Sequence, residues 1–195
     1  MKDKLIIQGD WRKATEKHPL RPAIEEFSYA IIAYKEMVGI PEFNEFEKSW
    51  KLFLHHIDRV WNKTHAICRN KKGWQKIESK IKSARKKDPL LRYIIQARNI
   101  DEHSIADLSK DWESNFEGKV TGFNIELTWK PWDRPLLPIN NRGVVFDPPT
   151  SHLGKDIGHL KQKGKSEPRI VAELALDYYC DLLNMVSTEL FGNNY

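Results

Sequence analysis

The amino-acid sequence predicts a mainly α protein, an antiparallel helical bundle with a small antiparallel β-sheet inserted before its last helix. Apolar residues recur at spacings of three and four along most of the chain, which is the period of amphipathic helices. Between residues 117 and 147 the period changes to two, as in half-buried strands. The chain of 195 residues is long enough for one well-packed domain, 1–195, and nothing in it suggests a second.

Two helices open the predicted bundle. Pro22 suits the first turn of a helix whose apolar positions continue to Met37, until Gly39 and Pro41 break the pattern. The second helix has the strongest pattern in the chain, an aromatic-rich stripe that supplies most of the apolar area for a core. Its apolar positions are Phe43, Phe46, Trp50, Phe53, Leu54, Ile57, Val60, Trp61 and Ile67.

The next two predicted helices meet at Asp88 and Pro89. A shorter amphipathic helix ends before this pair, and its apolar side consists of Trp74, Ile77, Ile81 and Ala84. Asp88 can cap the following helix, because its carboxylate accepts hydrogen bonds from free backbone N–H groups, and Pro89 suits the first helical position. We expect that helix to run from about Pro89 to Trp112.

The helix from Leu91 to Trp112 has a charged middle. Apolar residues at both of its ends share one face, and Arg98 and Asp101 lie close to the centre of that same face. Charges in such a place are costly unless they are paired or lie at a cleft or an interface. We therefore expect the middle of this helix to face a cleft in the bundle or a second subunit.

The inserted sheet is predicted after Glu117. Its first strand alternates apolar and polar residues, with Phe123, Ile125, Leu127 and Trp129 as the apolar positions. Residues 147–166 are expected to form a loop, in which His152 and His159 are exposed. A final helix follows from Pro168, with apolar residues at helical spacing as far as Met185.

The composition indicates a globular protein of the reducing cytoplasm. No apolar run approaches the roughly 18 residues that span a bilayer, and the N-terminus lacks the apolar core of a signal peptide, so we expect no membrane partner. Cys68 and Cys180 have apolar neighbours, the usual setting of a reduced, partly buried thiol. His65 lies three residues before Cys68, but no second pair accompanies them, so we expect no metal site. The glycine spacing matches no phosphate-binding loop, and we expect no cofactor.

A basic segment from Arg69 to Lys87 dominates the charge of the chain. It holds nine Lys or Arg residues and one acidic residue, a net charge of +8 against +5 for the whole chain. A concentrated basic face attracts polyanions, nucleic acid above all, although runs of charge are most often a solvated helix face. The candidate RNA-binding residues are Lys72, Lys76, Lys80, Arg85, Lys86 and Lys87.

Residues 97–103, ARNIDEH, resemble the signature of the HEPN superfamily, helical bundles named for their occurrence in higher eukaryotes and prokaryotes. That signature is an Arg, four to six residues and then a His, commonly with a polar residue directly after the Arg. Here Arg98, Asn99 and His103 match it, with four residues between the Arg and the His. In a HEPN-like bundle the predicted sheet would be an insertion.

The resemblance implies metal-independent RNA cleavage at a homodimer interface, in a ribonuclease of toxin or phage-defence type with an antitoxin or regulatory partner. Imidazole titrates near neutrality, so His103 would transfer a proton when the RNA 2′-hydroxyl attacks the phosphorus. Arg98 would clamp the negative charge of the phosphorane, and Asn99 would bind the phosphate or orient the imidazole. Asp101 and Glu102 would be supporting residues.

Helix geometry complicates this implied mechanism. In an ideal helix Arg98 and His103 are about 140° apart around the axis, so one straight helix cannot easily aim both at one phosphate. Either the helix is distorted near Ile100, or the site combines residues from two subunits. Two other functions stay open: a non-catalytic module that binds RNA, a nucleotide or a protein, and a structural role in which Arg98 pairs with Glu102.

Overall fold

The computed structural model describes residues 18–39, 43–103, 149–156 and 168–192. These residues are mainly helical, which confirms the predicted fold class at that level. Their five helices are α2 (Arg21–Gly39), α3 (Phe43–Cys68), α4 (Trp74–Lys87), α5 (Pro89–His103) and α7 (Pro168–Phe191). None of these helices is long and apolar enough to cross a membrane. The predicted sheet at 117–147 and the predicted helical residues 104–112 lie outside the described ranges.

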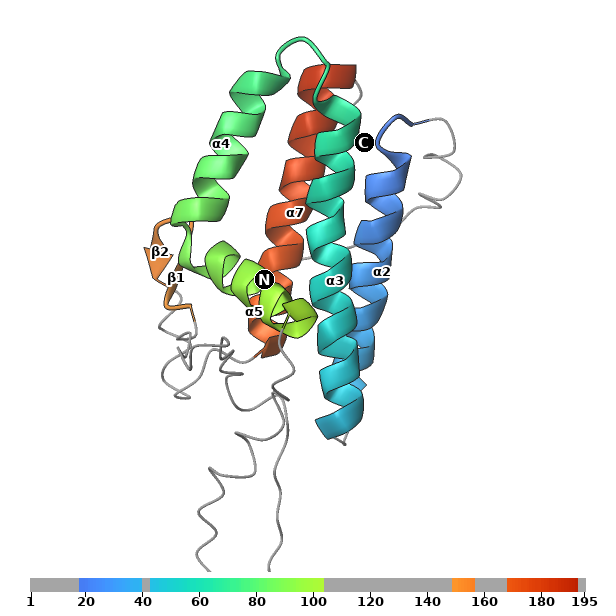
Figure 1. Cartoon of the computed structure of the whole chain (residues 1–195), viewed down its shortest axis with the longest axis vertical. Helices are drawn as coiled ribbons and strands as arrows, with labels where there is room; N and C mark the ends of the chain where they lie inside the picture. The colour runs from blue at the N-terminus through green and yellow to red at the C-terminus, as the bar shows by residue number, and fades with distance from the viewer. Residues whose placement is uncertain (1–17, 40–42, 104–148, 157–167, 193–195) are drawn as a thin grey trace, which may run out of the picture.

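Three long helices, α2, α3 and α7, form the body of the bundle and lie side by side in Figure 1. At one end of the body Tyr34 of α2 donates a hydrogen bond to Glu173 of α7, and at the other His18 lies 3.3 Å from the Ser187 hydroxyl. These two contacts make α2 and α7 antiparallel. α4 descends along one side of the body, and α5 then crosses its long axis (Figure 1). Arg98, which belongs to the predicted charged middle of the fourth helix, is thereby brought against α3.

Helices α2, α3, α4 and α7 begin and end within a few residues of their predicted bounds, and α5 begins at Pro89 as predicted. Pro22 lies in the first turn of α2, and Pro168 is the first residue of α7. α4 begins directly after Gly73, whose φ of 89° is in the left-handed region that glycine adopts without strain. Asp88 is the predicted cap of α5, because its Oδ1 accepts a hydrogen bond from the backbone N–H of Leu91 at 3.0 Å.

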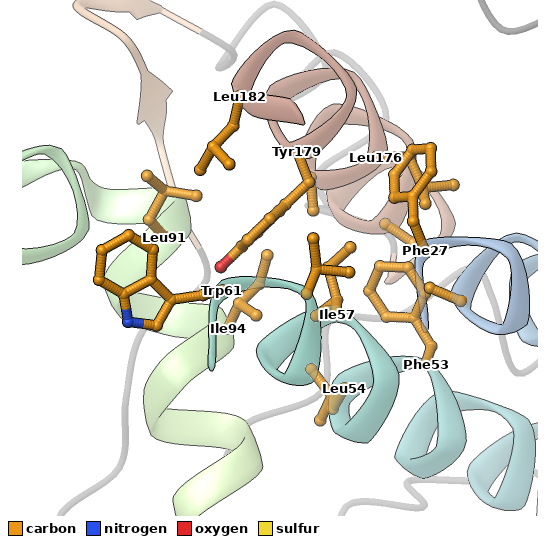
Figure 2. Packing of buried hydrophobic residues seen from close by; sticks show 14 of the residues in the cluster. Phe27, Phe53, Leu54, Ile57, Trp61, Leu91, Ile94, Leu176, Tyr179 and Leu182 are labelled. Carbon is orange, nitrogen blue, oxygen red and sulfur yellow. The ribbon is translucent and has the colours of Figure 1, made fainter. Parts of the chain in front are cut away.

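The core lies between α3 and the helices around it. Its largest fully buried side chains include Trp50, Phe53 and Ile57 from the aromatic-rich stripe of α3, which confirms the predicted role of that stripe. Figure 2 shows Tyr179 reaching from α7 toward this stripe and toward the Leu91 and Ile94 side of the core. Burial of each such side chain stabilises the fold by about 1.5–3 kcal/mol relative to exposure, before the cost of ordering it.

Part of the predicted loop at 147–166 forms a hairpin instead. Strands β1 (Ser151–His152) and β2 (Lys155–Asp156) pair antiparallel around a turn at Leu153 and Gly154, both of which have positive φ. The hairpin lies beside the start of α5 (Figure 1). It is anchored there because the Leu153 N–H donates to Oδ2 of Asp88 at 2.6 Å. A contact so distant along the chain leaves no trace in local periodicity, so the sequence pattern alone predicted a loop.

Candidate functional site

Arg98 lies on the inner side of α5, as its position on the apolar face predicted. Its side chain is 25% exposed, and its Nε lies 3.6 Å from Oδ2 of Asp58 on α3. Its Nη1 donates to the side-chain oxygen of the neighbouring Asn99 at 3.2 Å. The charge on this face is therefore paired, and Asp58 of another helix is one partner. The side chain of Glu102, the partner considered from the sequence, lies outside the described residues.

Asp58 is the centre of a polar group that joins four helices, the Asp58 cluster (Asp58, Asn62, Arg85, Arg98 and Tyr179). Oδ1 of Asp58 accepts a hydrogen bond from Nη2 of Arg85 on α4 at 2.9 Å. Oδ2 accepts from Nδ2 of Asn62, one turn further along α3, also at 2.9 Å. The Asp58 side chain is 12% exposed, so its carboxylate has little access to water. Its negative charge is instead matched by the guanidinium groups of Arg85 and Arg98.

Arg85 belongs to this interior cluster and is not part of an exposed basic surface. Its side chain is 13% exposed, its Nη1 donates to the Tyr179 hydroxyl, and its guanidinium lies 5.3 Å from the centre of the Trp61 ring. Burial raises the pKa of Tyr179 to about 12, although Arg85 opposes the shift, so the hydroxyl stays protonated. The sequence held a signal for this placement: Arg85 follows Ile81 by four residues and therefore shares the apolar face of α4.

The other candidate RNA-binding residues are on the outer side of α4 and just before it. These exposed residues are Lys72, Lys76, Lys80, Lys86 and Lys87, and we call them the α4 basic face. None of the five forms an ion pair with another described residue, whereas Lys82 pairs with Glu78 at 2.5 Å. The helix spans about 20 Å along its axis. Because Arg85 is in its last turn, the basic face ends beside the Asp58 cluster.

The motif residues lie on a regular stretch of helix. The backbone of α5 is α-helical from Pro89 through His103, so a distortion near Ile100 does not bring Arg98 and His103 to the same side. Asn99 is exposed next to Arg98. The side chains of Asp101, Glu102 and His103 lie outside the described residues. Of the predicted catalytic set, the structure brings Arg98 and Asn99 together.

A second polar contact, between Asp88 and His152, was not predicted. Nδ1 of His152 lies 3.0 Å from Oδ1 of Asp88, and the two side chains are 9% and 5% exposed. His152 is therefore buried in the hairpin, not exposed in a loop as predicted, with its ring edge-on to Tyr178. The two partners are 64 positions apart, and nothing in the sequence around either residue signals the pairing.

His65 and Cys68, the pair considered from the sequence as metal ligands, make other contacts. Nε2 of His65 lies 3.0 Å from Glu78 of α4, and Cys68 is fully buried, which raises the pKa of its thiol to about 11. Among the described residues no group of three or more His, Cys, Asp or Glu side chains is arranged to hold a metal ion.

A polar cluster between α2 and α3 was also missed from the sequence. Glu26 accepts hydrogen bonds from Arg59 Nε at 2.7 Å and contacts Nδ1 of His56 at 2.9 Å. It is a structural link between the two helices, and it lies on the α2 side of α3, away from the Asp58 cluster.

Comparison with known proteins adds no further evidence about the function of this site. No protein-family model, curated protein or solved structure matches the chain. The candidate site consequently rests on the sequence motif, the α4 basic face and the Asp58 cluster.

Proposed function

We propose that this chain is a cytoplasmic HEPN-like endoribonuclease of toxin or phage-defence type, acting as a homodimer without a metal ion. One observation carries the proposal: the α4 basic face ends beside the cluster that holds Arg98 of the motif. Lysine side chains that form no ion pair with another described residue attract the phosphate backbone of RNA over the length of α4. An RNA strand bound along the α4 basic face would bring one of its phosphates near Arg98.

The residue types suit cleavage of RNA by its own 2′-hydroxyl. That oxygen attacks the phosphorus, the bond from phosphorus to the 5′-oxygen breaks, and one proton moves from the first oxygen to the second. His103 would transfer this proton, since imidazole changes charge near neutral pH. Arg98 would stabilise the extra negative charge on the phosphorane through its N–H groups. Asn99, which already accepts a hydrogen bond from Arg98, would keep that guanidinium oriented.

The regular α5 helix argues for a site made by two subunits. On one helix Arg98 and His103 are about 140° apart, so a phosphate held by Arg98 faces away from His103 of the same chain. A two-fold axis near α5 would place His103 of one subunit beside Arg98 of its mate. An antitoxin or regulatory protein would act by covering this interface.

The experiment that tests the proposal is an RNA cleavage assay with the purified full chain in the presence of EDTA. We expect cleavage that His103→Ala abolishes, whereas the control His55→Ala, a change at an exposed histidine of α3, leaves it intact. Circular dichroism and thermal unfolding of both variants show whether the fold is retained. Cleavage by His103→Ala at the wild-type rate would refute the assignment.

A non-catalytic RNA-binding module is the second candidate, favoured by the ion pair between Arg98 and Asp58, which offsets part of the charge that catalysis needs. It requires salt-sensitive RNA binding that survives His103→Ala, with no cleavage products. In either case the double variant Lys76→Gln/Lys80→Gln should weaken RNA binding. The slope of log affinity against log salt should become shallower by about 0.7 for each phosphate that the variant no longer neutralises.

A further inference from the structure

We propose that Asp58 is the positioning residue for Arg98, and that Arg85 holds Asp58 in place for this role. As a statement about catalysis the inference rests on the proposed RNA cleavage. Its structural half, that Asp58 determines how the Arg98 guanidinium is oriented, stands on the Asp58 cluster alone. Neither residue belongs to the sequence motif, and each lies on a different helix from Arg98.

The two oxygens of Asp58 have separate partners. Oδ1 accepts from Arg85 at 2.9 Å, while Oδ2 accepts from Asn62 at 2.9 Å and lies 3.6 Å from Nε of Arg98. The contact of Asp58 with Arg98 is thus longer than its hydrogen bond to Arg85. A carboxylate that faced Arg98 alone would neutralise it, but this one is already matched by Arg85. Within the cluster one carboxylate is therefore shared between two guanidinium groups.

The direction of the contact also matters. Asp58 approaches Arg98 at Nε, on one side of the guanidinium. Two neighbouring N–H groups on one guanidinium edge are the arrangement that grips a phosphate. On the outer side of α5, the side-chain oxygen of Asn99 accepts a hydrogen bond from Nη1 of Arg98. Asp58 and Asn99 together hold the guanidinium plane from two directions.

Arg85 can hold Asp58 because it is itself anchored on three sides. It bonds Asp58 of α3 and Tyr179 of α7, and it stacks on Trp61. The movement of Arg85 is therefore limited by the packing of three helices. Arg85 in turn limits the movement of the Asp58 carboxylate, which contacts Arg98. Small displacements of a group that orients a reacting phosphate cost about 100-fold in rate.

Asp58→Asn tests the inference, because it keeps the shape of the side chain and removes its charge. The first measurement is the NMR signal of the Arg98 Nε–H group in the free protein, assigned by its disappearance in Arg98→Lys. We expect this signal to shift and to exchange with water faster in Asp58→Asn. The matched control is Asp181→Asn, the same chemical change at an exposed residue of α7, which should leave the signal unchanged.

The second measurement is RNA cleavage, in which we expect Asp58→Asn to lower kcat by about 10- to 100-fold with little change in KM. If Asp58→Asn does not fold, Asn62→Ala removes one partner of the carboxylate at an exposed position and should shift the Arg98 signal in the same direction by less. An unchanged Arg98 signal in these variants overturns the inference. A shifted signal in Asp58→Asn, together with a wild-type protein that cuts no RNA, upholds the positioning of Arg98 and refutes the proposed catalysis.

Discussion

Asp58 and Glu26 are both largely buried carboxylates, and each has two basic partners from other positions in the bundle. Asp58 contacts Arg85 and Arg98, and Glu26 contacts His56 and Arg59. Buried carboxylates are tolerated only when they are paired, and removing one partner leaves an uncompensated charge. Neither pairing could be read from the sequence, because the partners belong to contacts between helices that local periodicity does not describe. The sequence did show that Arg98 is a charged residue on an apolar helix face, which predicts a paired charge. The ion pair with Asp58 confirms that prediction.

Glu26 makes the free energy of unfolding depend on pH in the acid range. Its burial opposes ionisation, but the hydrogen bonds and charges of His56 and Arg59 outweigh that effect and hold its pKa below the usual 4.5. A carboxyl group with a lowered pKa stabilises the fold above its unfolded pKa, and the contribution is lost as pH falls through the folded value. His18, whose pKa burial lowers from 6.5, acts in the same direction at higher pH.

We therefore expect the free energy of unfolding to fall as the pH drops below about 5, and Glu26→Gln to lessen that fall while lowering stability at neutral pH. Urea unfolding of both proteins across this range measures the effect. The control is Glu36→Gln, at an exposed position of the same helix, which should keep the wild-type acid dependence. An identical acid dependence in Glu26→Gln would show that Glu26 does not contribute.

At the scale of the elements, the positions of the helices in the sequence could be predicted, but the contacts between elements far apart in the chain could not. Apolar spacing, prolines and glycines are local signals, and they predicted the bounds of α2, α3, α4 and α7 to within a few residues. The same spacing placed Arg98 toward the core, and the spacing along α4 places Arg85 there as well. The hairpin β1–β2 depends on Asp88, far away in the chain, and no local pattern reports such a contact.

Asp88 stabilises two elements at once, so its removal should cost more than an ordinary helix cap. It caps α5 through Leu91 and also binds the hairpin through Leu153 and His152. A cap alone contributes about 1 kcal/mol, and hydrogen bonds to a charged group contribute about 1.5–3 kcal/mol each. We expect Asp88→Ala to lower the free energy of unfolding by at least about 2.5 kcal/mol, the sum of the cap and one such hydrogen bond. Urea unfolding measures this, with Asp181→Ala as an exposed control; a decrease no larger than that of the control would contradict the dual role.

At the scale of the whole molecule, the arrangement of helices decides what one chain can do alone. α5 crosses the bundle with Arg98 turned inward against α3, and the helix stays regular as far as His103 (Figure 1). Because α5 is a regular helix, position 103 lies about 140° around the helix axis from Arg98. If both residues serve one phosphate, the second must come from another copy of the chain.

Mixing two inactive variants tests this requirement directly. Arg98→Ala and His103→Ala each lack one half of the proposed site, but a dimer of one of each contains one site with an intact Arg98 and an intact His103. Random exchange of equal amounts makes half of the dimers mixed, so activity should recover to about one quarter of the wild-type value. Size-exclusion chromatography with light scattering establishes that the proteins are dimers, and cleavage is measured before and after exchange. No recovery from confirmed mixed dimers, with an active wild type, would place Arg98 and His103 in the same subunit's site and refute the shared one.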